Sequence, residues 1–206
     1  MNRFIFKRIS EYNALDIKED ISLKQNEVLV FVLIIDTPQK KNIDMNFNLK
    51  KEFCKLHLYV IENGILGQDI NINLKIEHIY PNTISKTYIR RVMRDGSLSF
   101  IKGLVKIDKF ATGSNAYFNE KTLLLGDRIV SKVIPSLEII PNNVKASHAS
   151  SISGIREDEL FYLESRGINK KDSINSISSG FLIAKLKDIE DQKFREKVIN
   201  EVIKNI

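Results

Sequence analysis

The clearest alternation in the chain is the stretch Ile43-Asp44-Met45-Asn46-Phe47-Asn48-Leu49, in which every second side chain is apolar. Residues 70–77 repeat the pattern as Ile70-Asn71-Ile72-Asn73-Leu74-Lys75-Ile76-Glu77. Successive side chains of a strand point to opposite faces, so a period of two predicts strands with one buried face. The periodicity extends from Ile21 to about Val144. We predict further short strands at residues 56–61, 87–92, 98–107, 123–130 and 137–140.

The predicted strands are separated by turns rather than by helices. Turn-forming residues occur at Glu62-Asn63-Gly64, Tyr80-Pro81-Asn82, Arg94-Asp95-Gly96 and Gly126-Asp127. Because no amphipathic helix lies between the strands, the alternating pattern of a doubly wound sheet is absent. Apolar residues also recur every 24 to 26 positions, at Leu23, Leu49, Leu74, Phe100 and Leu125. This spacing favours a β-solenoid of stacked coils, and an all-β sandwich is the alternative.

Beyond His148 the apolar period changes to that of helices. We predict helices at 157–167, 170–184 and 188–205, the first with an acidic first turn and with Gly167 as its C-cap. We expect the three helices to bury the following apolar residues: Leu160, Phe161 and Leu163; Ile174, Ile177 and Phe181; and Phe194, Val198, Ile199, Val202, Ile203 and Ile206. The last of these apolar stripes must cover the end of the solenoid or contact another protein.

The sequence therefore divides into three parts. Residues 1–20 form an N-terminal segment that reads equally as a short helix, an edge segment or a frayed arm. Residues 21–152 form the β-rich core, and residues 153–206 form a C-terminal helical region. A chain of 206 residues with 43 % apolar side chains can bury a substantial core.

Composition and motifs exclude several classes of protein. The net charge of +6 comes from interspersed charges of both signs, and pairs such as Arg90-Arg91 are expected to be solvated rather than to bind a polyanion. We therefore expect neither nucleic-acid nor membrane binding. Neither a secretory signal nor a membrane-spanning run is evident, which favours a cytoplasmic protein. The chain has no P-loop, nucleophile elbow or paired-cysteine metal motif, so we do not expect an enzyme.

Two residues are candidates for chemistry. His148 lies between Ser147 and Ala149, where little bulk can bury it, and imidazole is a ligand for iron or zinc. Cys54 is the only thiol, which excludes an internal disulfide, and one cysteine cannot hold a cluster alone. A lone cysteine is most often a small buried residue. His57 and His78 are expected to be surface or hydrogen-bonded residues.

Two tracts together resemble a known family. The run from Ser147 to Ile168 includes Leu160-Phe161-Tyr162-Leu163-Glu164-Ser165-Arg166-Gly167-Ile168, and it is similar to the SufB/SufD family of the SUF iron–sulfur cluster assembly machinery. There a Cys-x-His step leads into an acidic helix start and Leu-Phe-Tyr-Leu-x-Ser-Arg-Gly-Ile. Residues 100–127 also resemble the family's late rungs. The resemblance covers about residues 21–182 and implies a right-handed parallel β-helix followed by a small helical region. Most of the N-terminal half of a typical longer member has no counterpart, which suggests a minimal or truncated version.

The resemblance also implies a function and partners. It indicates a non-catalytic scaffold or accessory component of SUF-type cluster assembly, in complex with a SufC-like ABC-type ATPase and a second SufB/SufD-type subunit. Whether that subunit is a second copy or a paralogue stays open. His148 occupies the family's cluster-associated step, but Ala146 replaces the usual cysteine, so the chain looks more SufD-like and a partner would supply sulfur. Implied contacts with the ATPase are Leu160, Phe161, Tyr162, Arg166, Ile174 and Phe181.

No cofactor is expected to be bound permanently. The resemblance implies a transient iron–sulfur cluster that this chain shares with the partner subunit. Ala146 also supports an alternative from the residues themselves. In that alternative the chain is a β-solenoid protein-binding module that has lost cluster chemistry.

Overall fold

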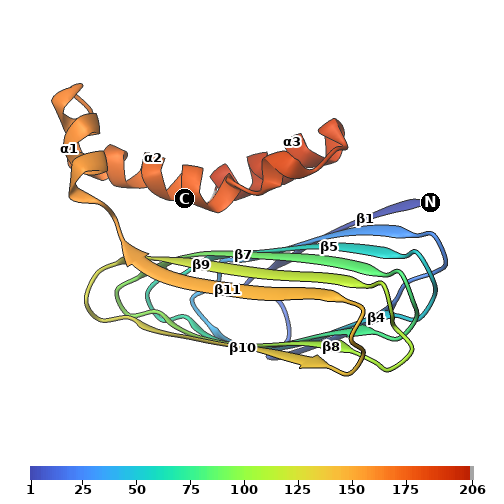
Figure 1. Ribbon diagram of the computed structural model, residues 1–206. Coiled ribbons are helices and arrows are strands. Elements are labelled where there is room, and N and C mark those ends of the chain that lie inside the picture. Colours follow the sequence, from blue (N-terminus) through green and yellow to red (C-terminus); the bar gives the residue numbers. More distant parts are fainter. Residues whose placement is uncertain (205–206) are drawn as a thin grey trace.

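The computed structural model describes residues 1–204, in which strands stack into two parallel sheets and helices follow (Figure 1). Sheet A has the order β1-β3-β5-β7-β9-β11, and sheet B has the order β10-β8-β6-β4-β2. The chain alternates between the sheets, and every strand pair is parallel. The strands of sheet A are β1 Asn2–Ile9, β3 Val28–Ile35, β5 Lys55–Asn63, β7 Ile84–Arg94, β9 Asn115–Leu125 and β11 Lys145–Gly154. Those of sheet B are β2 Asp16–Ser22, β4 Lys40–Leu49, β6 Asp69–His78, β8 Leu98–Ile107 and β10 Val130–Ile139. This stacking confirms the predicted parallel β-solenoid with a helical C-terminal region.

The core lies between the two sheets, where inward side chains of successive rungs form ladders. Ile43, Ile72 and Ile101 are register partners on β4, β6 and β8, and all three belong to the main apolar cluster. Consecutive members of this ladder are 29 residues apart, as are the hydrogen-bonded residues Asp44 and Asn73 of the same strands. The expected repeat of 24 to 26 residues is therefore too short for these rungs, although β1 and β3, and β2 and β4, are offset by 26 residues. It mixed the two faces, because Leu74 points inward whereas Phe100 follows the outward register.

Most predicted strands form where the alternation indicated. The strand predicted at 98–107 is β8, while residues 43–49 and 70–77 lie inside β4 and β6. The strand predicted at 123–130 is wrong, because it spans the turn between β9 and β10, where Gly126 has a φ of 137°. Residues 62 and 63 belong to β5, although they were interpreted as part of a turn. Strand ends are hard to predict where apolar residues lie on both sides of a turn or where polar residues lie inside a strand.

The N-terminal segment, which the sequence left open, consists of β1 and β2. These strands pair with β3 and β4 and continue the same stack. The inward positions of this first rung carry charged side chains: Arg3 pairs with Glu27 at 2.8 Å, and Lys7 pairs with Glu19 of the opposite sheet. Inward-pointing charge is one way in which proteins stop further strands from adding to a sheet edge.

The helices lie along the outer face of sheet A (Figure 1). They are α1 Glu157–Ser165, α2 Lys170–Ile183, the short 3₁₀ turn η1 Leu186–Asp188 and α3 Gln192–Ile203. Leu182, Leu186 and Val198 are fully buried in a second apolar cluster, with outward side chains of β3 and β5. Of the two alternatives for the last helix, covering the solenoid's end is thus wrong, and contact with another protein stays a prediction. The helix covers a sheet face, and Phe194 packs on Phe4 of β1 with ring centroids 5.1 Å apart.

Local signals define the helix ends. Asn169 caps α2 by accepting from the Asp172 amide at 2.9 Å, and Asp191 caps α3 by accepting from the Phe194 amide at 2.7 Å. Helix α1 ends at Gly167 (φ +85°), where the Ile168 amide donates to the Leu163 carbonyl at 3.2 Å. In α3, Val198 and Val202 are buried but Ile203 is 48 % exposed, against expectation. Residues 205 and 206, part of the same prediction, lie outside the described residues.

Candidate functional site at the open end of the solenoid

The solenoid ends in two strands whose outer edges are free within the described residues. Strand β11 is the last strand of sheet A and β10 is the last strand of sheet B. The inward positions of β11 are aligned with those of β9, so Ala146, His148 and Ser150 follow Ala116, Phe118 and Glu120. No further rung covers these side chains in the described chain. An unpaired strand edge beside an uncovered interior is a surface suited to pairing with another chain.

His148 lies in the middle of β11, and its side chain is exposed at this open end. Strand β11 continues beyond His148 to Gly154, two residues past the predicted end of the core at residue 152. Residues 149–154 include three serines and a glycine, which give a weak strand signal in the sequence. They adopt the extended conformation because each one pairs with a residue of β9. The imidazole is therefore held by a regular strand, next to the ring of the register partner Phe118.

A buried ionic network lies behind the open end. The Arg91 Nε donates to Glu120 Oε1 at 3.3 Å, and the Arg91 Nη1 is 3.7 Å from Glu62 Oε2. All three side chains have no exposed surface. The network reaches the last rungs through hydroxyl groups: Arg91 Nη2 donates to Ser131 Oγ at 2.7 Å, and Ser150 Oγ donates to Glu120 Oε2 at 2.6 Å. The open end is thus connected by hydrogen bonds to a charged interior.

The electrostatics of the network are set by burial. Two carboxylates share one guanidinium, and desolvation raises the pKa of Glu62, although Arg91 and a hydrogen bond from Ser99 oppose this. The Gln68 amide donates to Glu62 at 2.6 Å, while its own Oε1 is buried without a partner. Buried charges of this kind are expensive unless each is paired.

The sequence interpretation missed this network. Arg90 and Arg91 were expected to be solvated, but both are buried, on opposite faces of β7. A signal was present for one pair, because Glu62 and Arg91 are register partners at the same 29-residue interval as the apolar ladder. Strand alternation also places Arg91 on the inward face, between Ile89 and Met93.

Cys54 is buried at the turn that enters β5, and its Sγ is 2.9 Å from the Lys51 carbonyl oxygen. Burial raises the pKa of this thiol. Strands β7 and β9 lie between β5 and β11, so Cys54 is at least about 14 Å from His148 at the usual strand spacing. The structure does not bring the two candidate residues together, and they cannot share one metal ion.

The other two histidines have different environments. His78 is fully buried, with Nδ1 2.7 Å from Thr83 Oγ1 and Nε2 2.8 Å from Ser85 Oγ. Desolvation lowers the pKa of His78 to about 4, so the ring is neutral at physiological pH. His57 is half-buried on the outer face of sheet A, and burial lowers its pKa as well.

The residues expected to contact an ATPase fall into two groups. In α1, Phe161 is 72 % exposed and Tyr162 is 57 % exposed, and the Arg166 guanidinium lies over the Tyr162 ring at 5.2 Å. The expectation that Phe161 is buried is wrong, because α1 stands off at the end of the helical layer and buries no residue (Figure 1). Leu160 is half-buried. In α2, Ile174 is half-buried, and Phe181 packs into the cluster on sheet A.

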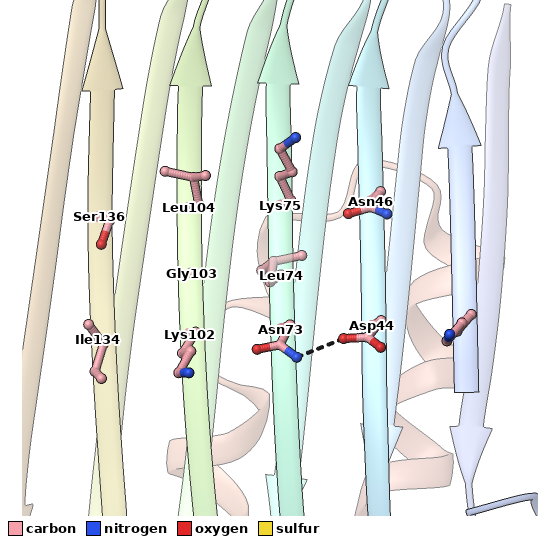
Figure 2. Close-up of a pocket in the computed structure, with 11 residues that line it drawn as sticks. Asp44, Asn46, Asn73, Leu74, Lys75, Lys102, Gly103, Leu104, Ile134 and Ser136 are labelled. Atoms are coloured by element: carbon pink, nitrogen blue, oxygen red, sulfur yellow. Dashed lines mark hydrogen bonds between the residues drawn. The ribbon is translucent and has the colours of Figure 1, made fainter. Parts of the chain in front are cut away.

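The outer face of sheet B carries a shallow pocket of about 580 Å³ (Figure 2). Its lining includes Asp44, Asn73 and Lys102 from three neighbouring strands, and the Asn73 amide donates to Asp44 at 2.7 Å. These are the polar members of the alternation that identified the strands. None of the candidate site residues predicted from the sequence lines this pocket.

Comparisons with known proteins agree with this architecture. A sequence profile described as "SUF system FeS cluster assembly, SufBD core domain" matches residues 21–181. The chain belongs to the SufB/SufD family. Iron–sulfur cluster assembly protein SufB of Bacillus subtilis is 30 % identical over 116 residues, which are 56 % of this chain and 25 % of that protein. A SufBD family protein of Synechocystis is 33 % identical over 114 residues, 55 % of this chain and 24 % of the relative.

A plant protein, ABCI7 (chloroplastic) of Arabidopsis thaliana, matches over more of this SufB/SufD-family chain. It is 28 % identical over 152 residues, which are 73 % of this chain and 31 % of that protein. The matched stretch thus covers about a quarter to a third of these relatives' own lengths.

The chemistry available to this SufB/SufD-family chain follows from its side chains. The exposed imidazole of His148 can supply one nitrogen ligand, whereas Ala146 has no ligand atom and Cys54 is buried. Within residues 1–204 no group of three or more His, Cys, Asp or Glu side chains is arranged to hold a metal ion. In the same residues, no helix has the length and apolar character needed to cross a membrane.

Proposed function

We propose that this chain is a non-catalytic scaffold component of SUF-type iron–sulfur cluster assembly that works in a cytoplasmic complex. The observation that carries the proposal is the uncovered final rung, in which a regular strand holds His148 beside two free sheet edges. Membership of the SufB/SufD family supplies the biochemical context. The iron–sulfur cluster is cargo in this proposal, not a resident cofactor.

A second SufB/SufD-type subunit, either another copy or a paralogue, would cover the edges of β10 and β11. Exposed apolar side chains support this arrangement, since Ile139 of β10 is 44 % exposed and Ile152 of β11 is 48 % exposed. Pairing of the edges would bury both and would satisfy the free backbone groups. The partner would supply the sulfur ligands that this chain lacks, with His148 facing the shared space.

A SufC-like ATPase would bind at α1. Phe161 and Tyr162 expose large aromatic surfaces on a helix that contributes nothing to the core, and aromatic residues are typical of interface hot spots. Arg166, which lies over the Tyr162 ring, extends the same surface. Phe181 already packs on sheet A, so its part would be to hold the helical layer in place.

The assembly is tested by co-expression of the chain with the ATPase and the SufB/SufD-type subunit encoded beside it, followed by affinity purification. A Phe161→Ala/Tyr162→Ala variant should lose the ATPase and keep the second subunit. Leu66→Ala, which removes another highly exposed apolar side chain from a turn, is the matched control. Failure of the unmodified chain to retain either protein would refute the proposed complex.

The role of His148 is tested in the purified complex by reconstitution with iron and sulfide, with the cluster measured by its visible absorption. His148→Ala should lower the cluster yield while the complex stays intact, and His57→Ala, on the outer face of sheet A, should leave the yield unchanged. The alternative function, a protein-binding module without cluster chemistry, is favoured by Ala146 and by the burial of Cys54. An unchanged yield in His148→Ala would establish that alternative.

A further inference from the structure

A second cavity, of about 570 Å³, lies between the outer face of sheet A and the loop that joins η1 to α3. Strands β1, β3, β5 and β7 form its floor, and residues 188–191 form the opposite wall. Its volume is that of a typical small-molecule site. Part of the lining is apolar, and this part consists of Phe4, Val28, Val30, Ile84 and Ile189.

The floor of this cavity is basic. Lys55 and His57 lie on β5, and Lys86 is the register partner of His57 on β7. All three side chains project from the same face, because 55 and 57 are two positions apart along the strand. Both lysines are exposed, and neither forms an ion pair with another described residue. Two positive charges that no carboxylate neutralises therefore line one side of the cavity.

The opposite wall is acidic. Asp188 pairs with Lys185 at 3.1 Å, and Asp191 accepts from the Phe194 amide as the cap of α3. Glu190 has no ion-pair partner among the described residues, and it is exposed. Glu190, Lys86 and His57 all line this one cavity. The cavity is thus lined by one carboxylate and two ammonium groups that form no ion pair with described residues.

We propose that this cavity binds a short zwitterionic peptide of two or three residues. The carboxylate of the peptide would pair with Lys55 and Lys86, and its ammonium group would pair with Glu190. A central apolar side chain would lie against Val30 and Ile189. A ligand with charges of both signs satisfies both walls at once, whereas an anion or a cation alone leaves one wall unpaired. Charge-assisted hydrogen bonds at two ends also fix the orientation of the ligand.

The test uses the full chain and three forms of one tripeptide: Gly-Leu-Gly, its N-acetylated form and its C-terminal amide. Binding is measured by titration calorimetry at low ionic strength, where screening is weak. The unmodified tripeptide should bind, and blocking either end should weaken binding at least about tenfold, equivalent to about 1.4 kcal/mol. No detectable binding of Gly-Leu-Gly, or equal binding of all three forms, would overturn the proposal.

Two variants assign each end of the peptide to its wall. In the double variant Lys55→Met/Lys86→Met, which removes both ammonium groups, Gly-Leu-Gly and its amide should bind equally, while the acetylated form still binds more weakly. In Glu190→Gln, the acetylated and unmodified forms should bind equally, while the amide still binds more weakly. Lys102→Met changes an exposed lysine on sheet B and is the matched control, with binding unchanged. The same loss in the control, or the same pattern in both wall variants, would contradict the assigned orientation.

Discussion

Removal of the Arg91 guanidinium should destabilise the solenoid strongly. Arg91 is the only cation in contact with Glu62 and Glu120 among the described residues, and all three side chains are fully buried. In Arg91→Met, two carboxylates would share an interior with no positive charge. Breaking a buried ionic group in this way costs about 3–5 kcal/mol, because the remaining charge stays desolvated. The free energy of unfolding, measured by urea denaturation followed by circular dichroism, should fall by this amount at about pH 7.5.

The loss should depend on pH. Burial raises the pKa of Glu62 even in the intact chain, so its protonated form is favoured by folding. A raised folded pKa contributes stability that is complete below the unfolded value of about 4.3 and is lost as the pH rises through the folded value. Without Arg91, which lowers the pKa of Glu62, this trend should be steeper. The deficit of Arg91→Met should therefore shrink when the pH falls from about 7.5 to about 5.5.

Two further variants separate charge from packing. Arg90→Met alters the neighbouring arginine on the outer face, which donates to the Asn119 side chain at 2.8 Å and contacts no carboxylate. It should cost less, about 1.5–3 kcal/mol, with no pH dependence. The triple variant Glu62→Gln/Arg91→Met/Glu120→Gln should recover most of the loss. A deficit below about 1 kcal/mol for Arg91→Met, or one that the triple variant shares in full, would refute the reasoning.

Three other substitutions have defined outcomes. His78→Asn should abolish a pH-dependent contribution to stability of about 3 kcal/mol. Because the folded pKa of His78 is about 4, this contribution is complete above the unfolded pKa of about 6.5 and is lost as the pH falls toward 4. Thermal unfolding measured from pH 7 to pH 4 tests this. Gly103→Ala should destabilise by about 1–3 kcal/mol in urea, since the new Cβ would lie 2.6 Å from the Phe118 ring, and Phe118→Leu should relieve part of that loss. Leu182→Ala should cost about 2–5 kcal/mol and raise hydrogen exchange in the helical layer above that of sheet B; uniform exchange would contradict a separately docked layer.

Much of the solenoid was predictable because its signals are local. Alternation over a few residues defines a strand with two faces, as in β4, β6 and β8. The end of α1 was equally readable, because Gly167 adopts a positive φ that other residues reach only with strain. The position of the helical layer also had a signal that the sequence interpretation did not use. Residues 28–35 are apolar without interruption, which is typical of a strand covered on both faces, and β3 is buried in that way.

The candidate site was predictable only in part. The exposed position of His148 agrees with its small neighbours, but its place inside a long edge strand depends on pairing with β9, about 30 residues earlier in the chain. The exposure of Phe161 was not predictable, because an apolar helix position is buried only if another surface meets it. The chain's second cavity joins strands near the N-terminus to a loop near residue 190, and such a distance in sequence leaves no local pattern.

The sequence alone determined the period-two strands, the turns between them, the order of strands before helices and the absence of a second thiol, since each follows from neighbouring residues. Only the tertiary structure decided how the buried charges pair, how the helices dock on sheet A and which edge is left open. The physical reason is that burial and pairing depend on stacked rungs, whose register partners lie 26 to 32 residues apart in the chain. Arg91 shows the difference: neighbouring residues predict its strand, but its ion-pair partners, Glu62 and Glu120, lie on two other strands.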